Sequence, residues 1–406
     1  MRTRIKSIPG SYTTIVHEMM IRLTVFALLC FSIYSCKKDG PTTNGIVQFV
    51  YTSDLHYGAP RSFRGANVDA GVVNQALVNQ INTLPVKTFP DDGGVNAGEM
   101  IETIDFVIIT GDITDRQEVG PPQIQAAAIS WGQFAVDFLN GITLNNRDRQ
   151  KVGFLLECGN HDVSNAIGYT KPVYPLTDAT AMVNIYNLML APAMPRTNVT
   201  YNYSADKINY SRDIAGVHFL FVNMWPDSVQ RIWMEKDLAN VVSTTPVIIF
   251  THDQPDCEAK HFTNPNGTHD INSIDKFENV VEERFKDADT IKVESTIEQR
   301  NLVAFLKVHK NIKAYFHGND CNNEFYIYKG PDNDISLNVF RVDSPVKGII
   351  SGTEAEDGMG DETKLSFQTI VIDGDAKTMT VRECLWNTSG SASPIVWGIS
   401  STISLK

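Results

Sequence analysis

The stretch VGFLLECGNHD, residues 152–162, places an apolar run directly before a glycine and three polar residues. A short apolar run bounded by a turn signal is typical of a buried strand. The same arrangement occurs in four other places: residues 46–51 before Asp54 and His56, 104–110 before Asp112, 247–251 before His252, and 312–316 before His317 and Asn319. The sequence therefore predicts buried strands that carry polar side chains at their carboxyl ends.

Helical patterns lie between these strands, over residues 66–81, 121–139 and 295–309. Within 121–139 the apolar residues recur at steps of three and four, as in a helix that packs one face on a sheet. Strands that alternate with helices predict an α/β fold. Open α/β sheets bind ligands beyond the carboxyl ends of their strands. The polar clusters all fall at that position, so we expect the functional site there.

After Asp320 the pattern is that of strands, over 325–328, 337–342, 367–372 and 378–384, with a hairpin turn at Asp373-Gly374-Asp375. We therefore predict one domain over 46–390, followed by a C-terminal tail over 391–406. Three long loops interrupt this domain, over 85–100, 169–201 and 253–274. Long loops in compact domains are often functional, so we expect them to select the substrate.

The polar clusters have the composition of a site for two metal ions. Such a site supplies hydroxide at neutral pH and neutralises the charge on a phosphoryl group. Asp54 and His56 are two residues apart at a strand end, so both side chains can leave the strand on one side. Asp112 can bridge the two ions. Asn160 offers an amide oxygen and His252 an imidazole to the second ion.

The remaining requirement for hydrolysis of a phosphate ester is a proton for the leaving oxygen. His161 has the side chain best suited to donate that proton or to stabilise the leaving oxygen. Asp162 follows it directly, and we expect its carboxylate to fix the tautomer of the His161 ring.

The order Asp-x-His, Gly-Asp, Gly-Asn-His-Asp, His and a final His-containing loop resembles the calcineurin-like metallophosphoesterase family over about residues 46–320. The resemblance implies an αββα four-layer sandwich with two mixed β-sheets, the late strands lying in the second sheet. It also implies hydrolysis of a small phosphate mono- or diester by a hydroxide that two metal ions activate. It makes His161 the catalytic histidine and assigns five metal ligands: Asp54, His56, Asp112, Asn160 and His252. The oxygen and nitrogen ligands suit Mn, Fe, Zn or Mg.

The last motif departs from the family pattern Gly-His-x-His, because this chain reads FHGNDC over residues 316–321. Matching His-x-His onto His317 and Asn319 gives His317 to the second metal and the amide of Asn319 to the first. The other register places the thiolate of Cys321 on the first metal instead. A second departure is Asp115, which stands where purple acid phosphatases of this superfamily have a tyrosine. The iron-tyrosinate subtype is therefore not expected.

The N-terminal region has the features of a targeting signal. Residues 21–34 form an apolar run of the length found in signal peptides, and it ends at Ile33-Tyr34-Ser35-Cys36, which resembles a bacterial lipobox. We predict a lipoprotein signal over 1–35, with Met19 or Met20 as the true start, and a tether over 36–45. A lipid on Cys36 would hold the protein at the cell envelope, on the periplasmic face or the outer membrane surface. A plain cleaved signal or a short anchor helix is the alternative.

Charge and cysteine content limit the other function classes. The chain has 35 basic and 47 acidic residues and a formal net charge of −12, so its surface repels phosphate backbones and no nucleic-acid binding is expected. The cysteines are too dispersed for a disulfide scaffold, although a single Cys257–Cys321 bridge remains an alternative.

The alternative to an enzyme is an envelope lipoprotein that only binds a ligand, and the altered last motif would be the evidence for it. The intact Asp112 and His161 favour the enzyme.

Overall fold

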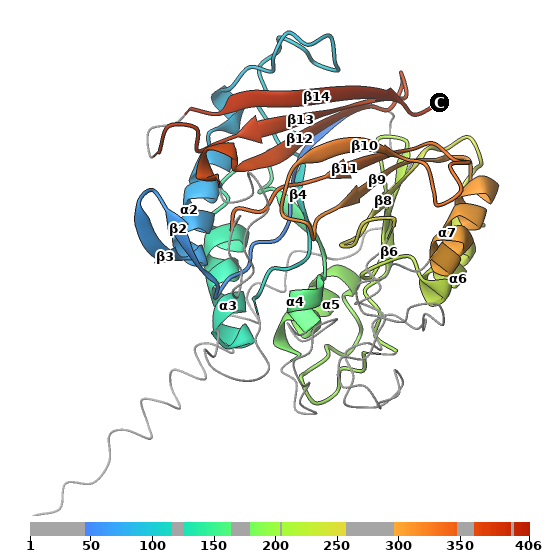
Figure 1. Ribbon diagram of the computed structural model, residues 1–406, viewed down its shortest axis with the longest axis horizontal. Helices are drawn as coiled ribbons and strands as arrows, with labels where there is room; N and C mark the ends of the chain where they lie inside the picture. The colour runs from blue at the N-terminus through green and yellow to red at the C-terminus, as the bar shows by residue number, and fades with distance from the viewer. Residues whose placement is uncertain are drawn as a thin grey trace, which may run out of the picture. The chain divides into compact units, whose positions relative to one another are not determined.

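Two six-stranded sheets form the centre of the structure (Figure 1). The computed structural model describes residues 45–115, 125–163, 179–203, 205–256, 296–346, 361–390 and 394–406, which belong to a unit spanning Thr43–Lys406. Four earlier predictions lie outside the described residues, apart from Gly45: the signal over 1–35 with Met19 and Met20, the tether over 36–45, the lipid site at Cys36, and Cys257 as a disulfide partner.

The first sheet has the strand order β14-β13-β12-β1-β4-β5. Its strands β1, β4 and β5 are parallel, whereas β12, β13 and β14 pair antiparallel. The bounds are β1 (Ile46–Thr52), β4 (Phe106–Thr110), β5 (Gly153–Glu157), β12 (Ser366–Asp373), β13 (Thr378–Leu385) and β14 (Val396–Ser404). The sheet is therefore mixed, with the three strands nearest the predicted site pointing the same way.

The second sheet has the order β10-β11-β9-β8-β7-β6 and is also mixed. Strands β11, β9, β8 and β7 are parallel neighbours, and the two edge strands pair antiparallel. The bounds are β6 (Tyr210–Ile214), β7 (Val217–Phe221), β8 (Val247–Phe250), β9 (Ile312–His317), β10 (Glu324–Tyr328) and β11 (Leu337–Arg341). Two mixed sheets confirm the predicted fold class.

Aromatic side chains join the inner faces of the two sheets. The ring of Phe49 on β1 lies 5.8 Å from that of Phe219 on β7, and Tyr51 on β1 lies 5.3 Å from Phe316 on β9. Both distances lie in the range of favourable aromatic pairs. All four rings are fully buried, so this layer fixes one sheet on the other and with it the relative position of their strand ends.

Helices accompany both sheets (Figure 1). On the first sheet's side are α2 (Ala70–Ile81) and α3 (Ala127–Phe134), and a π-helical segment over Ala135–Asn140 continues α3. Helix α5 (Thr180–Leu190) contacts β5. Helices α6 (Ser228–Leu238) and α7 (Thr296–Val308) lie together beside the second sheet. Short elements complete the set: α4 (Asn160–Val163), the 3-10 turns Leu84–Val86 and Glu362–Lys364, and the hairpin strands β2 (Pro60–Phe63) and β3 (Ala66–Asp69). The buried amide of Asn74 on α2 donates to the carbonyl of Leu55, which ties this helix to the loop after β1.

The predicted helix over 66–81 is wrong in its first four residues. They form β3, which pairs with β2 through a two-residue turn at Arg64 and Gly65. Both turn residues have positive φ, 51° and 79°, and such turns match the twist of a β-hairpin. The helix begins only after Asp69. A period of three to four residues does not register so short a strand.

Two further predictions need correction at the C-terminal end. The resemblance implied that the late strands lie in the second sheet, but only β10 and β11 do, whereas β12, β13 and β14 return to the first. The tail predicted over 391–406 contains β14, which pairs with β13 from Thr378↔Ser404 to Leu385↔Val396. Its alternation of half-buried and exposed residues is weak because an edge strand has one free side.

The long loop over 85–100 is fastened to the first sheet. The buried guanidinium of Arg382 on β13 donates to both carboxylate oxygens of Asp92, at 2.8 Å each, and Thr380 accepts from the backbone N–H of Val95. The indole of Trp397 on β14 donates to the carbonyl of Thr88. The loop therefore covers β13 and β14.

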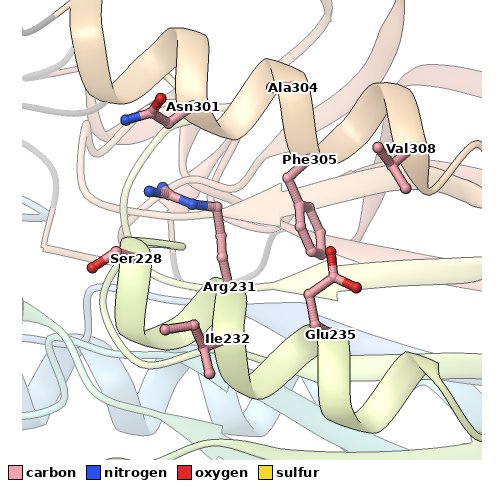
Figure 2. Close-up of a pocket in the computed structure, with 8 residues that line it drawn as sticks. All are labelled: Ser228, Arg231, Ile232, Glu235, Asn301, Ala304, Phe305 and Val308. Atoms are coloured by element: carbon pink, nitrogen blue, oxygen red, sulfur yellow. The ribbon is translucent and has the colours of Figure 1, made fainter.

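A groove of about 440 Å³ lies between α6 and α7, where Arg231 and Glu235 on α6 extend toward α7 and Phe305 points back toward α6 (Figure 2). None of its lining residues belongs to the polar clusters, and Arg231 is engaged by Glu298 at 3.0 Å. Across the described part of the chain, no helix combines the length and apolar character needed to cross a membrane.

Candidate metal centre

The carboxyl ends of five strands meet at one place. The loops after β1 and β4 are joined by backbone hydrogen bonds from Asp54 to Gly111 (3.0 Å) and from His56 to Asp112 (2.8 Å). In the second sheet, the N–H of Gly318 donates to the carbonyl of His252 at 3.0 Å. The N–H of Asn319 then reaches the carboxylate of Asp54 at 3.1 Å, which connects the two sheets. The predicted clusters thus form a single site.

The loops at this site are held in a strained conformation. Asp54, His56 and Asp112 have φ values of 56°, 42° and 48°, in the left-handed region that side chains rarely adopt. Such residues cost of the order of 1–3 kcal/mol each and collect at functional sites. All three are buried, and each sits directly at or after a strand end.

Two glycines allow the loops to approach these carboxylates. A Cβ at Gly159 would lie 2.2 Å from Oδ1 of Asp112, and a Cβ at Gly318 would lie 2.2 Å from Oδ2 of Asp54. Real Cβ atoms do not come so close to another heavy atom. No other residue type fits at either position unless the carboxylates move.

The ring of His252 directs its Nε2 at two oxygen acceptors. Its Nδ1 lies 2.8 Å from the carbonyl of Thr110, so Nδ1 carries the proton and donates it. Its Nε2 then faces the amide oxygen of Asn160 at 3.0 Å and Oδ2 of Asp112 at 3.4 Å. The lone pairs of this nitrogen and of the two oxygens therefore point at one another. Such an arrangement is stable only if the ring carries a second proton, on Nε2, or if a cation lies between the three atoms. This donor set fits a divalent metal ion.

A second convergence surrounds His56. Its Nε2 lies 3.8 Å from Oδ1 of Asp54 and 3.7 Å from Oδ2 of Asp112, and it has no hydrogen-bond partner among the described residues. Asp112 lies in both groups, as the predicted bridging ligand should. A buried polar atom without a partner costs about 1–3 kcal/mol, and a metal ion would remove that cost.

Electrostatics at the site point the same way. Burial lowers the pKa of His56, but Asp115, Asp112 and Asp54 raise it to about 9. Burial likewise opposes protonation of His252, yet Asp112 and Asp54 raise its pKa well above the ordinary value. The pKa of Asp54 is raised by burial and by the charge of Asp112. The clustered carboxylates therefore attract positive charge, and a divalent cation would supply it while displacing the protons.

His161 is oriented by Asp115. Its Nδ1 lies 2.7 Å from Oδ1 of Asp115, and the same oxygen lies 3.4 Å from Nδ1 of His56. Burial would raise the pKa of Asp115, but its close contacts with the two histidine rings hold that pKa at about 2. The carboxylate therefore stays ionised beside both rings. His161 is also the most exposed of the three, at 14% of its side chain.

The structure does not give Asp162 the role predicted for it. Its carboxylate accepts backbone N–H groups of Gly159 (2.9 Å), Thr114 (2.9 Å) and Ile113 (3.3 Å), not the ring of His161. A residue next to another on one helical turn points away from it, so Asp162 faces the β4 loop. It holds that loop and the loop after β5 together.

His317 and Asn319 do not present the predicted ligand atoms. Nδ1 of His317 lies 2.9 Å from the carbonyl of Gly318 and Nε2 lies 3.0 Å from the hydroxyl of Tyr326, so both ring nitrogens are engaged. Burial and then the charge of Arg341 lower the pKa of His317 to about 3, which keeps it neutral. The side-chain amide of Asn319 donates to Gln254 at 3.1 Å. The register that placed these two residues on the metals is not the one seen.

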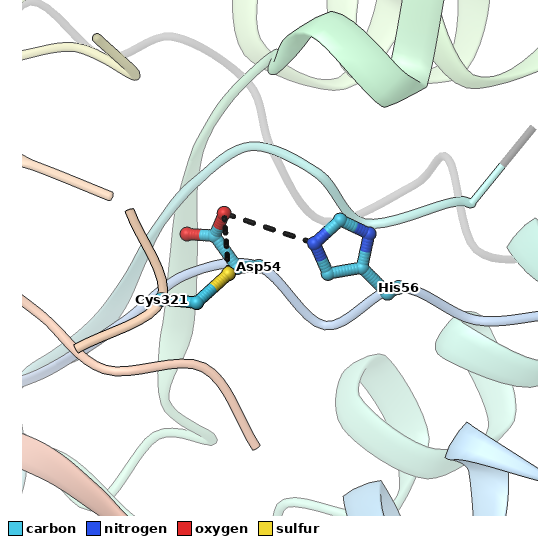
Figure 3. A group of neighbouring side chains, drawn as sticks. All are labelled: Asp54, His56 and Cys321. Atoms are coloured by element: carbon cyan, nitrogen blue, oxygen red, sulfur yellow. Dashed lines mark hydrogen bonds and ion pairs between the residues drawn. The ribbon is translucent and has the colours of Figure 1, made fainter. Parts of the chain in front are cut away.

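Cys321 occupies the place expected of Asn319. Its Sγ lies 3.9 Å from Oδ1 of Asp54, and potential ligand atoms of Asp54, His56 and Cys321 all lie within 4.8 Å of one another (Figure 3). A second such group joins Asp54, Asp112 and His252. The thiol is buried and free of any disulfide.

Sequence reasoning missed Asp115 as a partner of His161. The signal was present, because Gly111-Asp112-x-x-Asp115 leaves the same strand end as the predicted bridging ligand. In the sequence, Asp115 indicated only that the iron-tyrosinate subtype is not expected. Adjacent sequence numbers favoured Asp162, whereas the fold brings together residues 46 positions apart.

Comparison with known proteins gives a sequence match over most of the domain. The family model described as calcineurin-like phosphoesterase matches residues 47–332. No curated protein matches the chain.

Solved structures with a similar arrangement share little sequence with this chain. A dimetal phosphatase from Danio rerio is 11% identical, covers 89% of this chain and 100% of its own, and has a TM-score of 0.48. The calcineurin-like phosphoesterase YfkN from Bacillus subtilis is 10% identical, with 89% and 91% covered and a TM-score of 0.32. A conserved uncharacterised protein from Streptococcus pneumoniae, described as a predicted phosphoesterase, is 9% identical, with 88% and 98% covered and a TM-score of 0.30.

Proposed function

The chain belongs to the calcineurin-like phosphoesterase family and is a metal-dependent hydrolase of phosphate esters, and on that premise we propose that it hydrolyses small phosphate mono- or diesters at a site for two metal ions. The observation that carries the proposal is the convergence at Nε2 of His252, which lies 3.0 Å from the amide oxygen of Asn160 and 3.4 Å from Oδ2 of Asp112. Asp54 and His56 provide the second half of the site.

Each ligand has a place in this proposal. Asp54 and His56 would hold the first ion, Asn160 and His252 the second, and Asp112 would bridge them. When bound, two such ions lower the pKa of water to about 7 and neutralise charge on the phosphoryl oxygens. The candidates are Mn, Fe, Zn and Mg.

The chain's own contribution to the chemistry is the pair of His161 and Asp115. Asp115 holds Nδ1 of His161, so its Nε2 can carry a proton toward the leaving oxygen of a bound ester. After the bond breaks, the ring would regain a proton from solvent, to which it is partly exposed. Asp162 keeps the two loops that carry these groups in register.

The location of the enzyme is proposed from the sequence alone. The apolar run before Ile33-Tyr34-Ser35-Cys36 supports a lipid on Cys36 and a place at the bacterial cell envelope. Phosphate esters outside the cytoplasm would then be its substrates, and nucleic acid is disfavoured by the net charge of −12.

The proposal is tested with an activated aryl phosphate ester. The purified chain is stripped by a chelator and reloaded separately with Mn, Zn, Fe or Mg. We expect turnover with at least one metal and its loss in Asp112→Asn, which keeps the volume but removes the bridging charge. An Asp332→Asn variant, in an exposed surface pair with Arg300, is the matched control. Absence of turnover with every metal would refute the proposal.

A further inference from the structure

We propose that Cys321 binds the first metal ion as a thiolate, in the place where the family motif supplies an imidazole. The inference rests on the proposed metal-dependent function, since it concerns one ligand of the same site. It makes that site a mixed one, in which a sulfur atom joins the carboxylate of Asp54 and the imidazole of His56.

The geometry of Figure 3 carries the first step. Sγ of Cys321 lies 3.9 Å and Nε2 of His56 lies 3.8 Å from Oδ1 of Asp54. Ligands at about 2.0–2.3 Å from a tetrahedral zinc ion are about 3.3–3.8 Å apart. The observed spacing therefore needs only a small contraction around an ion. All three residues are at most 7% exposed.

The second step is the unpartnered ring of His56. Its Nε2 is buried, accepts no hydrogen bond from any described residue, and is directed at the same carboxylate oxygen that Cys321 approaches. This observation is independent of the cysteine. A buried nitrogen in that position needs a partner, and a metal ion bound to it would also be within reach of Sγ of Cys321.

The loop that carries Cys321 presents sulfur rather than the side chain of Asn319. Gly318 packs on Asp54, and the N–H of Asn319 donates to that carboxylate, which sends the amide of Asn319 to Gln254. The next side chain, Asp320, is held away by Nη1 of Arg341 at 2.7 Å. Cys321 then returns to the site. In this register Gly318-Asn319-Asp320-Cys321 corresponds to Gly-His-x-His, with sulfur in the last position.

A thiolate changes which metals the first position prefers. Sulfur is a soft ligand that favours zinc over manganese or magnesium, which prefer oxygen. Binding must also release the thiol proton to solvent, because the thiolate is the ligand form. We therefore expect the two positions of the site to differ in metal selectivity, with the softer one next to β9.

The experiment loads the chelated full chain with Co²⁺ and records its near-ultraviolet spectrum, where a cobalt–thiolate bond gives an intense charge-transfer band. Wild type should show the band. Cys321→Ser should lose it, and Cys321→His, which restores the last histidine of the family motif, should bind cobalt without it. Cys384→Ser is the matched control, because this other buried free thiol lies on β13 outside the site, and it should keep the band.

Measuring zinc affinity gives a second test of the same inference. Losing an outer partner of a metal ligand already costs roughly 10–100-fold in affinity, so Cys321→Ala should weaken zinc binding at one position by at least about tenfold. Its effect on magnesium binding should be much smaller.

Wild type that binds cobalt fully without the band would overturn the inference, and this holds even if the Cys321 variants fail to fold. Aryl phosphate hydrolysis by such a protein would leave the proposed function standing. A band without hydrolysis under any metal would support the thiolate and refute the function, so the two failures are distinguishable.

Discussion

Oδ1 of Asp115 lies 2.7 Å from Nδ1 of His161 and 3.4 Å from Nδ1 of His56, so one carboxylate orients both the proposed proton donor and a proposed metal ligand. The contact spans the loops after three different strands, β1, β4 and β5. Orientation of the proton donor and geometry of the metal site are therefore coupled through this residue.

Asp115→Asn should lower kcat by impairing proton donation. The amide loses the charge that pairs with Nδ1 of His161 at 2.7 Å, and general acid catalysis is worth about 10²–10⁴-fold. The loss should be greater for an alkyl phosphate, whose leaving oxygen needs a proton, than for an activated aryl phosphate. Steady-state kinetics with both esters measure this. His161→Ala should show the same pattern, and equal losses on the two substrates would contradict the assigned role.

Asp162→Asn separates structure from chemistry. Its carboxylate accepts three backbone N–H groups, so the variant should unfold at a lower temperature. The ratio of activities on the aryl and alkyl esters should stay that of wild type. A changed ratio without loss of stability would show that Asp162 takes part in proton donation after all.

Arg382→Ala should destabilise the fold without changing the ratio of activities on the two esters. The substitution removes the buried partner of Asp92 and frees the loop over 85–100. Breaking a buried ion pair costs about 3–5 kcal/mol, and Asp92 keeps 14% exposure, so the lower end is expected. Urea unfolding gives the value. Arg300→Ala, in an exposed pair with Asp332, is the control and should cost less than about 1 kcal/mol.

His218 gives the stability a pH dependence. It is buried between Asp213 at 2.7 Å and Asp237 at 2.6 Å; burial lowers its pKa, but the two carboxylates raise it above the ordinary value. A raised pKa in the folded state means that the contribution is complete below the unfolded value of about 6.5 and is lost as the pH rises through the folded pKa. His218→Gln should therefore reduce the free energy of unfolding most in mild acid and least in alkali. A difference that does not vary with pH would exclude this pairing.

The strand ends could be predicted from sequence because each couples an apolar run to a polar cluster. Val152 to Cys158 is predicted as a strand and Gly153–Glu157 is observed, and the other four site strands agree to within a few residues. The sequence also predicted Asp112 between the two groups of ligands, and the structure places its carboxylate near both His56 and His252. What it could not predict were contacts across loops. The spacing of residues does not show that Asp115, rather than Asp162, contacts His161. Nor does it show that the backbone N–H of Asn319 binds Asp54, so that the side chain of Asn319 points away and Cys321 lies at the site.

The edge strand β14 was not predicted, for a different reason. A strand with one side free buries few residues, so Val396–Ser404 lacks the continuous apolar run that identified the central strands. The same limit applies to β3, which is four residues long and exposed.

Cys36→Ser tests the proposed location. Without the thiol no lipid can be attached, and the protein should leave the membrane fraction or remain unprocessed. Fractionation followed by immunoblotting measures this, with Cys30→Ser as the control in the same apolar run. Unchanged membrane association of Cys36→Ser would contradict the lipid anchor.

The central claim is that two metal ions bound by Asp54, His56, Asp112, Asn160 and His252 enable phosphate-ester hydrolysis. The most direct measurement titrates the chelated chain with the metal that best supports turnover, recording bound ions by mass spectrometry and hydrolysis in the same samples. The account predicts that hydrolysis rises with the second equivalent and levels off near two ions per chain, and that Asp112→Asn binds fewer ions and is inactive. Full activity at one ion per chain, or activity that survives complete removal of metal, would contradict it.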